Sequence, residues 1–196
     1  MWFRTYTHEV AQGRDPAAQR ATCIAIGAFD GVHRGHKALI ADMMARARAQ
    51  GLQAAVFTFD PLPKVFFGAA EPILSLQDRL DGLHDLGVEQ VHVASFDRAY
   101  AARPAEAFLD DLASIRVAEV HVGDDFRFGK GRAGTPELIR SRFRVVEKSA
   151  VLCDQGERIS STRIRALFKI GDLETARMLL GKTRAAMPAA HALGAA

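Results

Sequence analysis

The sequence has few cysteines, no long apolar run and no strong excess of one charge. Its two cysteines, Cys23 and Cys153, each lie in an apolar, strand-like segment, which favours buried thiols over a disulfide or a zinc site. No apolar run approaches the roughly 20 residues that a membrane span needs. The N-terminus also lacks the apolar stretch and cleavage site of a secretory signal. We therefore expect a cytoplasmic protein that does not associate with membranes.

The net charge of +3 weakly favours an anionic ligand. No stripe of Lys and Arg interleaved with exposed aromatic residues is evident, so we expect a phosphorylated small molecule as the ligand and no nucleic acid. The length of 196 residues allows one substantial core. We expect one domain over residues 1–182, followed by a loose C-terminal tail over residues 183–196.

Short apolar runs alternate with longer segments of helical periodicity. The runs predict strands at 21–27, 52–59, 88–95 and 117–123, and the longer segments predict helices at 36–50, 75–87 and 104–114. Strand and helix in alternation are typical of a parallel sheet covered on both faces. The expected fold class is α/β, a Rossmann-like open parallel sheet with helices on both faces.

Three Gly-, Pro- or charge-rich segments, 60–71, 123–135 and 155–161, break this alternation. Two of them directly follow predicted strands, and in an open α/β sheet such loops form the ligand crevice. Two further helical pieces, 160–171 and 172–181, each end at a glycine suited to a left-handed cap.

The segment 27–36 reads Gly-Ala-Phe-Asp-Gly-Val-His-Arg-Gly-His and leads from a strand into a helix. Glycines allow close backbone approach, and a helix N-terminus offers free N–H groups, so the segment suits a phosphate. His33 and His36 are three residues apart and can both point at one triphosphate. The alternatives are ordinary loop residues or zinc ligands, but no third ligand is near in sequence and the glycine frame suits phosphate better. We assign no residue as a direct metal ligand.

The same segment resembles the nucleotidyltransferase signature in the form used by bacterial FAD synthetases. Segments 57–67, 122–134, 158–165 and 171–181 agree with that family in order and spacing, so the resemblance covers roughly residues 23–182. It implies the FMN adenylyltransferase activity of that family. The FMN phosphate attacks the α-phosphorus of Mg-ATP, and diphosphate and FAD are formed. ATP, Mg²⁺ and FMN are thus the expected substrates and cofactors.

The resemblance also implies roles for individual residues. The catalytic residues are His33, His36 and Arg165, with Arg165 on the β- and γ-phosphates. The nucleotide-binding residues are Gly27, Phe29, Asp30, Gly31, Gly35, Ser160, Ser161 and Thr162. The flavin-binding residues are Phe59, Pro61, Asp125, Phe126 and Phe128.

Several of these residues also have a simpler interpretation. Ser and Thr at 160–162 commonly cap a helix, and Phe128 is nearly as well explained as core packing. Asp30 is expected to fix its loop by accepting backbone N–H bonds. Asp125, or Asp124 beside it, is expected to orient a ligand hydroxyl or to hold Mg²⁺ through water. Arg163 should face away from Arg165 as a solvated charge.

The sequence departs from the family at two points. Leu62 stands where members usually have His, which removes a polar group and puts flavin affinity or acceptor choice in doubt. The chain also stops about 15 residues after the Leu-Leu-Gly segment, where members continue into a riboflavin kinase. We expect no kinase activity and a separate riboflavin kinase that supplies FMN. Two other interpretations are a nucleotidyltransferase with another phosphorylated acceptor and a non-catalytic flavin- or nucleotide-binding module.

Overall fold

The computed structural model describes residues 2–7, 20–149, 152 and 156–181. Its sheet consists of β1 (Phe3–Thr7), β2 (Thr22–Ile26), β3 (Gln53–Asp60), β4 (Gln90–Ser95), β5 (Val117–Gly123) and β6 (Arg144–Lys148). The strand order is β1-β4-β3-β2-β5-β6. The expected loose tail over 183–196 lies outside the described residues, as does Cys153.

The sheet is parallel from β4 through β6, whereas β1 pairs antiparallel with β4. The prediction of a parallel α/β sheet is therefore confirmed for all strands but this edge. The sequence did not predict β1 or β6. Both are short edge strands, and Phe3 is the one fully buried residue of β1. Edge strands carry many polar residues, so they lack the apolar run by which the central strands were found.

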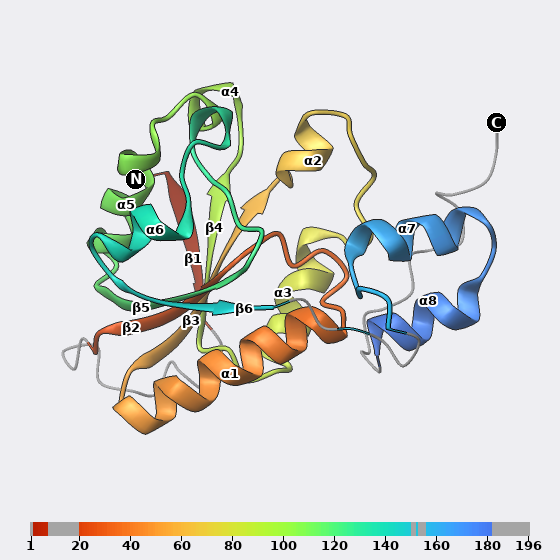
Figure 1. The fold of residues 1–196 in the computed structure, drawn as a ribbon, viewed down its shortest axis with the longest axis horizontal. Helices are drawn as coiled ribbons and strands as arrows, with labels where there is room; N and C mark the ends of the chain where they lie inside the picture. The colour runs from red at the N-terminus through yellow and green to blue at the C-terminus, as the bar shows by residue number, and fades with distance from the viewer. Residues whose placement is uncertain (1, 8–19, 150–151, 153–155, 182–196) are drawn as a thin grey trace.

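Helices cover both faces of the sheet, as predicted (Figure 1). They are α1 (Arg34–Gln50), α2 (Pro63–Phe66), α3 (Leu76–His84), α4 (Arg98–Ala101), α5 (Ala105–Ser114), α6 (Pro136–Arg140), α7 (Ser161–Lys169) and α8 (Leu173–Leu180), with a 3-10 turn at Lys130–Arg132. The glycines predicted to end the last two helices do so: Gly171 and Gly181 have φ angles of 78° and 72°. No helix in the described ranges is both long and apolar enough to cross a membrane.

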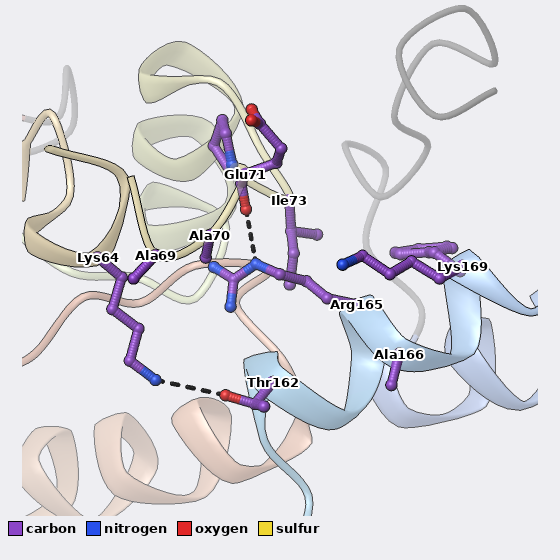
Figure 2. A pocket seen from close by; sticks show the side chains of 11 residues that line it. Lys64, Ala69, Ala70, Glu71, Ile73, Thr162, Arg165, Ala166 and Lys169 are labelled. Carbon is purple, nitrogen blue, oxygen red and sulfur yellow. Dashed lines mark hydrogen bonds between the residues drawn. The ribbon is translucent and has the colours of Figure 1, made fainter. Parts of the chain in front are cut away.

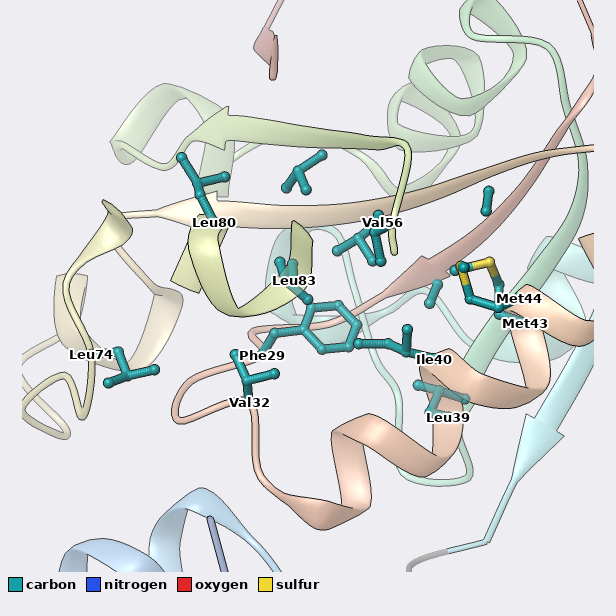
Figure 3. Packing of buried hydrophobic residues seen from close by; sticks show 14 of the residues in the cluster. Phe29, Val32, Leu39, Ile40, Met43, Met44, Val56, Leu74, Leu80 and Leu83 are labelled. Carbon is teal, nitrogen blue, oxygen red and sulfur yellow. The ribbon is translucent and has the colours of Figure 1, made fainter. Parts of the chain in front are cut away.

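Two hydrophobic clusters lie on opposite faces of the sheet, because successive side chains of a strand point to opposite sides. Cys23 and Ala25 of β2 join the cluster under α1 and α3, and Ile24 and Ile26 join the cluster under α5. Figure 3 shows the first cluster, in which the ring of Phe29 packs between these helices and the sheet.

The strand order changes direction at β2, which pairs with β3 on one side and with β5 on the other. In open α/β sheets, ligands bind beyond the carboxyl ends of the strands at such a switch point. The loops after β2, β3 and β5 all lie at this end of the parallel strands. The loops after β3 and β5 are two of the segments predicted to line the crevice, and the loop after β2 is the segment predicted to hold a phosphate.

Candidate functional site: a histidine pair at the switch point

The loop after β2 is held in an unusual backbone conformation by buried side chains. Phe29, Gly31 and Val32 have φ angles of 50°, 86° and 40°. The side chains of Phe29 and Val32 are fully buried, and they anchor the loop to the core. A side chain at Gly27 would lie 3.2 Å from the Phe29 ring. The loop is thus a rigid support for the residues that follow it.

His33 and His36 lie together at the N-terminus of α1. Their rings are stacked, with centroids 3.6 Å apart and planes 14° apart. His33 is the N-cap residue, and its Nδ1 accepts a hydrogen bond of 3.2 Å from the His36 backbone N–H. A side chain at Gly35 would lie 3.1 Å from the His33 ring, so glycine leaves room for that ring. The predicted convergence of the two imidazoles is present.

Both histidines are neutral at pH 7 in this structure. Burial lowers the pKa of His33 to about 4. Burial and the neighbouring His33 hold the pKa of His36 well below its usual value. Nδ1 of His36 is buried and has no hydrogen-bond partner among the described residues. Buried polar atoms are normally paired, so this atom points to a ligand or water that completes the site.

Asp30 joins the loop after β2 to two other segments. Its side chain accepts hydrogen bonds from the backbone N–H groups of Ile73 and Leu74, the shortest at 2.9 Å. It also forms an ion pair with Arg165, and its backbone carbonyl accepts a hydrogen bond of 2.8 Å from Ser161 Oγ. The expected backbone bonds are present, but they fix the chain 43 residues further on rather than the loop of Asp30 itself.

The start of α7 lies against the loop after β2, because Ser161 Oγ donates a hydrogen bond to the carbonyl of Asp30. Ser160 is the N-cap of α7, and its Oγ accepts a hydrogen bond from the Arg163 N–H at 3.2 Å, so the capping interpretation is confirmed. The Thr162 hydroxyl accepts a hydrogen bond of 3.4 Å from Lys64 Nζ. The expectation that Arg163 is a solvated charge was wrong, because its side chain is only 19% exposed and pairs with Glu157 at 2.5 Å.

Arg165 faces the predicted phosphate region but already has protein partners. Besides the ion pair with Asp30, its Nε donates a hydrogen bond of 2.6 Å to the backbone carbonyl of Glu71. Figure 2 shows this contact. Arg165 therefore connects α7 to the segment before α3.

Phe59 and Pro61, two predicted flavin contacts, lie at the carboxyl end of β3: Phe59 is within the strand and Pro61 directly follows it. Phe59 is half-buried, and its ring lies 5.8 Å from that of Phe96. Phe66 and Phe67 also pack edge to face against Phe96, and Phe67 remains 66% exposed. None of these three residues was predicted as a site residue from the sequence, although Phe66 and Phe67 stand within the family-like segment 57–67.

The other predicted flavin contacts follow β5, on the opposite side of β2. Asp125 is exposed and pairs with Arg158 at 2.8 Å. Phe126 is half-buried. Phe128 is only 8% exposed and pairs through its backbone with Gly134, where a side chain would lie 2.7 Å from its ring. For Phe128, the structure favours the core-packing interpretation.

Ring contacts connect the two groups of predicted flavin contacts. The series of neighbouring rings is Phe59, Phe57, Phe108, Phe128 and Phe126, with centroid separations of 5.2–5.8 Å. The loops after β3 and β5 therefore share one hydrophobic support, even though β2 lies between their strands.

Arg79 supports the ends of β2 and β3, a role that was not predicted from the sequence. This arginine is 2% exposed. It donates hydrogen bonds to the backbone carbonyls of Ala28 and Phe59 at 3.1–3.2 Å and contacts Asp60 at 3.2 Å. It thereby joins the ends of β2 and β3. An available signal was a charged residue within the leucine stripe of helix 75–87.

Comparisons with known proteins agree with this arrangement. A family model described as FAD synthetase matches residues 15–163. The chain belongs to the FAD synthetase family. The family resemblance inferred from the sequence is thereby confirmed.

Individual relatives share this assignment. A Geobacillus thermodenitrificans protein named putative bifunctional riboflavin kinase/FMN adenylyltransferase is 42% identical over 174 residues, which cover 89% of this chain and 96% of that protein. The Escherichia coli K12 bifunctional riboflavin kinase/FMN adenylyltransferase is 37% identical, over 84% of this chain and 56% of that protein. The chain thus spans about half the length of the Escherichia coli relative.

The fold of this FAD synthetase family member is also found among solved structures. A crystal structure named as that of a macrolide-efflux protein from Streptococcus pneumoniae superposes with a TM-score of 0.74 at 28% identity. The match covers 82% of this chain and 56% of that one.

Leu62, where the family usually has His, is buried at 4% exposure. It is the N-cap of α2, where no side chain caps the helix. The residue therefore acts here as an apolar support for α2, and the side chain does not face solvent.

Cys23 of β2 and Glu119 and His121 of β5 form a group of buried polar side chains. Their potential metal-binding atoms lie within 4.8 Å of one another. Glu119 accepts hydrogen bonds from Arg46 at 2.5 and 3.1 Å, and burial, with Glu119 beside it, raises the pKa of the Cys23 thiol to about 12. A protonated thiol and a carboxylate committed to arginine fit a buried ion-pair network and do not fit a cation site.

Proposed function

We propose that the chain is an FMN adenylyltransferase, which transfers AMP from Mg-ATP to FMN and forms FAD and diphosphate. The observation that carries this proposal is the junction of the His33 and His36 pair with the start of α7 through Asp30. This junction brings two imidazoles, a helix N-terminus and Arg165 together at the switch point of the sheet, in a chain that belongs to the FAD synthetase family. Such donors suit a polyphosphate.

In the proposed step, an oxygen of the FMN phosphate attacks the α-phosphorus of ATP. A new P–O bond forms, and the bond from the α-phosphorus to the oxygen that bridges the α- and β-phosphates breaks. The electron pair of that bond leaves with diphosphate. Because the attacking phosphate is already an anion, the reaction needs positioning and charge neutralisation more than it needs a general base.

His33 and His36 supply donors to the α-phosphate and to the leaving group. With Nδ1 of His33 accepting from the backbone, the proton of the neutral ring lies on Nε2. A bound phosphate raises the pKa of both rings, since an anion favours the charged form. Stacking at 3.6 Å opposes a charge on both rings at once, so one proton serves the pair.

The remaining predicted residues hold the substrates. Gly27, Gly31 and Gly35 permit close approach of the phosphates, and Ser160, Ser161 and Thr162 offer the N-terminus of α7. Phe59, Pro61 and Phe126 contact the flavin ring together with the half-buried Phe66 and Phe96 and the exposed Phe67, whose rings pack beside Phe59.

Mg²⁺ enters with ATP and neutralises charge on its phosphates. Asp30 has no free carboxylate oxygen for it, because both oxygens accept backbone or arginine donors. The exposed Asp124 and Asp125 are the nearby candidates for contact through water. FMN would be supplied by ATP-dependent phosphorylation of riboflavin by a separate riboflavin kinase in the cytoplasm.

Incubation of the purified chain with Mg-ATP and FMN, with riboflavin in parallel, tests the proposal by chromatography of the flavins. FAD and diphosphate in equal amounts from FMN are expected. FAD from FMN alone identifies an adenylyltransferase without kinase activity. No FAD from a folded sample that binds ATP would overturn the proposal, and would favour another phosphorylated acceptor or a binding module.

A further inference from the structure

A cavity lies between α7 and the segment 69–73, next to the site described above. Its volume is about 390 Å³. One wall is formed by α7 and the other by residues that precede α3, as Figure 2 shows. Its lining is Lys64, Ala69, Ala70, Glu71, Pro72, Ile73, Thr162, Arg165, Ala166, Phe168 and Lys169. We call it the basic pocket.

The polar residues of α7 that line the basic pocket occupy one face of the helix. Thr162, Arg165 and Lys169 are separated by three and four residues, the spacing that puts side chains on one side of a helix. In Figure 2, the amino group of Lys169 points back toward Arg165. At 1.5 Å per residue, this row is roughly 10 Å long. Its shape suits an extended ligand.

Positive charge in the basic pocket is only partly neutralised by the protein. Arg165 is paired with Asp30. Lys64 donates to the neutral Thr162 hydroxyl, and among the described residues neither Lys64 nor Lys169 forms an ion pair. Glu71 contributes its backbone carbonyl, and its carboxylate points away in Figure 2. Two uncompensated cations therefore face this cavity.

The basic pocket begins where the proposed nucleotide site ends. Thr162 and Arg165 belong to both, and Ser161 donates to the carbonyl of Asp30, three residues before His33. A linear polyanion that starts at the histidines and follows α7 passes Thr162 and Arg165 and reaches Lys169. Lys64 faces the same path from the opposite wall.

From this geometry we propose that Lys64 and Lys169 are further substrate-binding residues, which hold the terminal phosphate of ATP and the leaving diphosphate in the basic pocket. They select a nucleoside triphosphate over nucleotides with a shorter phosphate chain. This inference rests on the proposed function for the identity of the nucleotide. Its test uses binding alone and needs no turnover.

The test measures binding of ATP, inorganic diphosphate and AMP by calorimetry to the full chain and to Lys64→Met, Lys169→Met and the double variant. Methionine keeps the length of the side chain and removes its charge. Each variant should bind ATP and diphosphate about three- to tenfold more weakly, with AMP unchanged because it has no terminal phosphates. Lys169→Arg should restore binding. Arg48→Met removes an exposed charge at the far end of α1 and serves as the matched control.

Three results would overturn the inference: ATP and diphosphate affinities unchanged in both variants, AMP affinity reduced as much as that of ATP, or no binding of either polyphosphate to the unmodified chain. Failure of the proposed function is a separate observation. In that case the chain makes no FAD from FMN, yet the lysine variants still weaken ATP and diphosphate binding.

Discussion

The ring of His36 lies face to face with that of His33, and the same His33 ring accepts the hydrogen bond that caps α1. One side chain therefore has a structural role through Nδ1 and a proposed chemical role through Nε2. Substitutions can separate these two roles, because asparagine caps a helix well whereas alanine does not.

His33→Asn and His33→Ala should both lower kcat for FAD formation about 100- to 1000-fold, because each removes a donor to the transition state. Only His33→Ala should also lose about 1 kcal/mol of unfolding free energy, since it removes the cap. Steady-state kinetics and urea unfolding of both variants provide the measurement. Equal stability of the two variants would show that the cap contributes little.

Stability should fall as the pH is lowered from about 6.5 to about 4. Burial lowers the pKa of His33 and of His92 to about 4, so the unfolded chain binds protons in this range that the folded chain does not. Unfolding free energy therefore rises with pH in this window, by on the order of 2–3 kcal/mol for each histidine. Urea unfolding at pH 4.5, 5.5 and 7 measures the slope. His92→Asn should make the unfolding free energy depend less steeply on pH. An unchanged slope would contradict the lowered pKa of His92.

Arg79→Met should destabilise the protein by about 2–4 kcal/mol and raise the KM for ATP. It removes the buried guanidinium that donates to the carbonyls of Ala28 and Phe59, and Ala28 belongs to the loop proposed to bind phosphate. Thermal unfolding and FAD formation measure the two effects. Arg4→Met, which removes an exposed arginine on β1, is the control and should change neither.

Glu119→Gln should lower unfolding free energy by about 1–3 kcal/mol, because it removes the charged acceptor of the hydrogen bonds from Arg46 and Gln50, while the Arg46 side chain that remains is half-exposed. Hydrogen bonds from Arg46, His121 and Gln50 hold the pKa of Glu119 at about 2, so this stabilisation is present above pH 4.5 and is lost as the pH falls through 2. Glu106→Gln, at an exposed position, is the control. The KM for ATP and for FMN should stay unchanged in Glu119→Gln, and a raised KM would link the network to the site.

Leu62→His should destabilise the protein by about 1–3 kcal/mol without lowering the KM for FMN. The position is 4% exposed, and a buried imidazole without a partner costs free energy. Chemical unfolding and FMN titration in the FAD assay measure both quantities. A lower KM for FMN would show that the usual histidine of the family finds a partner here.

The central fold could be predicted from the sequence because its strands are continuous apolar runs between periodic helices. The edge strands could not, since Phe3 is the single buried side chain of β1 and the rest of that strand reads as a polar segment. Short helices such as α2 and α4 gave no periodic pattern at four residues each.

Residues of the site were predictable where one local motif carries them, as with His33 and His36. Contacts between distant segments were not. Asp30 was expected to hold its own loop, but its partners are Ile73, Leu74 and Arg165. Sequence spacing likewise gave no sign that Arg163 turns toward Glu157 or that Arg79 lies beneath the ends of two strands.

The Glu119 network and the histidine pair lie in different parts of the molecule. Glu119 lies in the amino-terminal half of β5 and pairs with Arg46 near the carboxyl end of α1, whereas the histidine pair lies at the amino end of that helix, after the carboxyl end of β2. Heat tolerance and substrate turnover can therefore be tuned independently in this chain. A library confined to the surroundings of Arg46 and Gln50 should yield variants that differ in melting temperature while their Michaelis constants remain those of the parent.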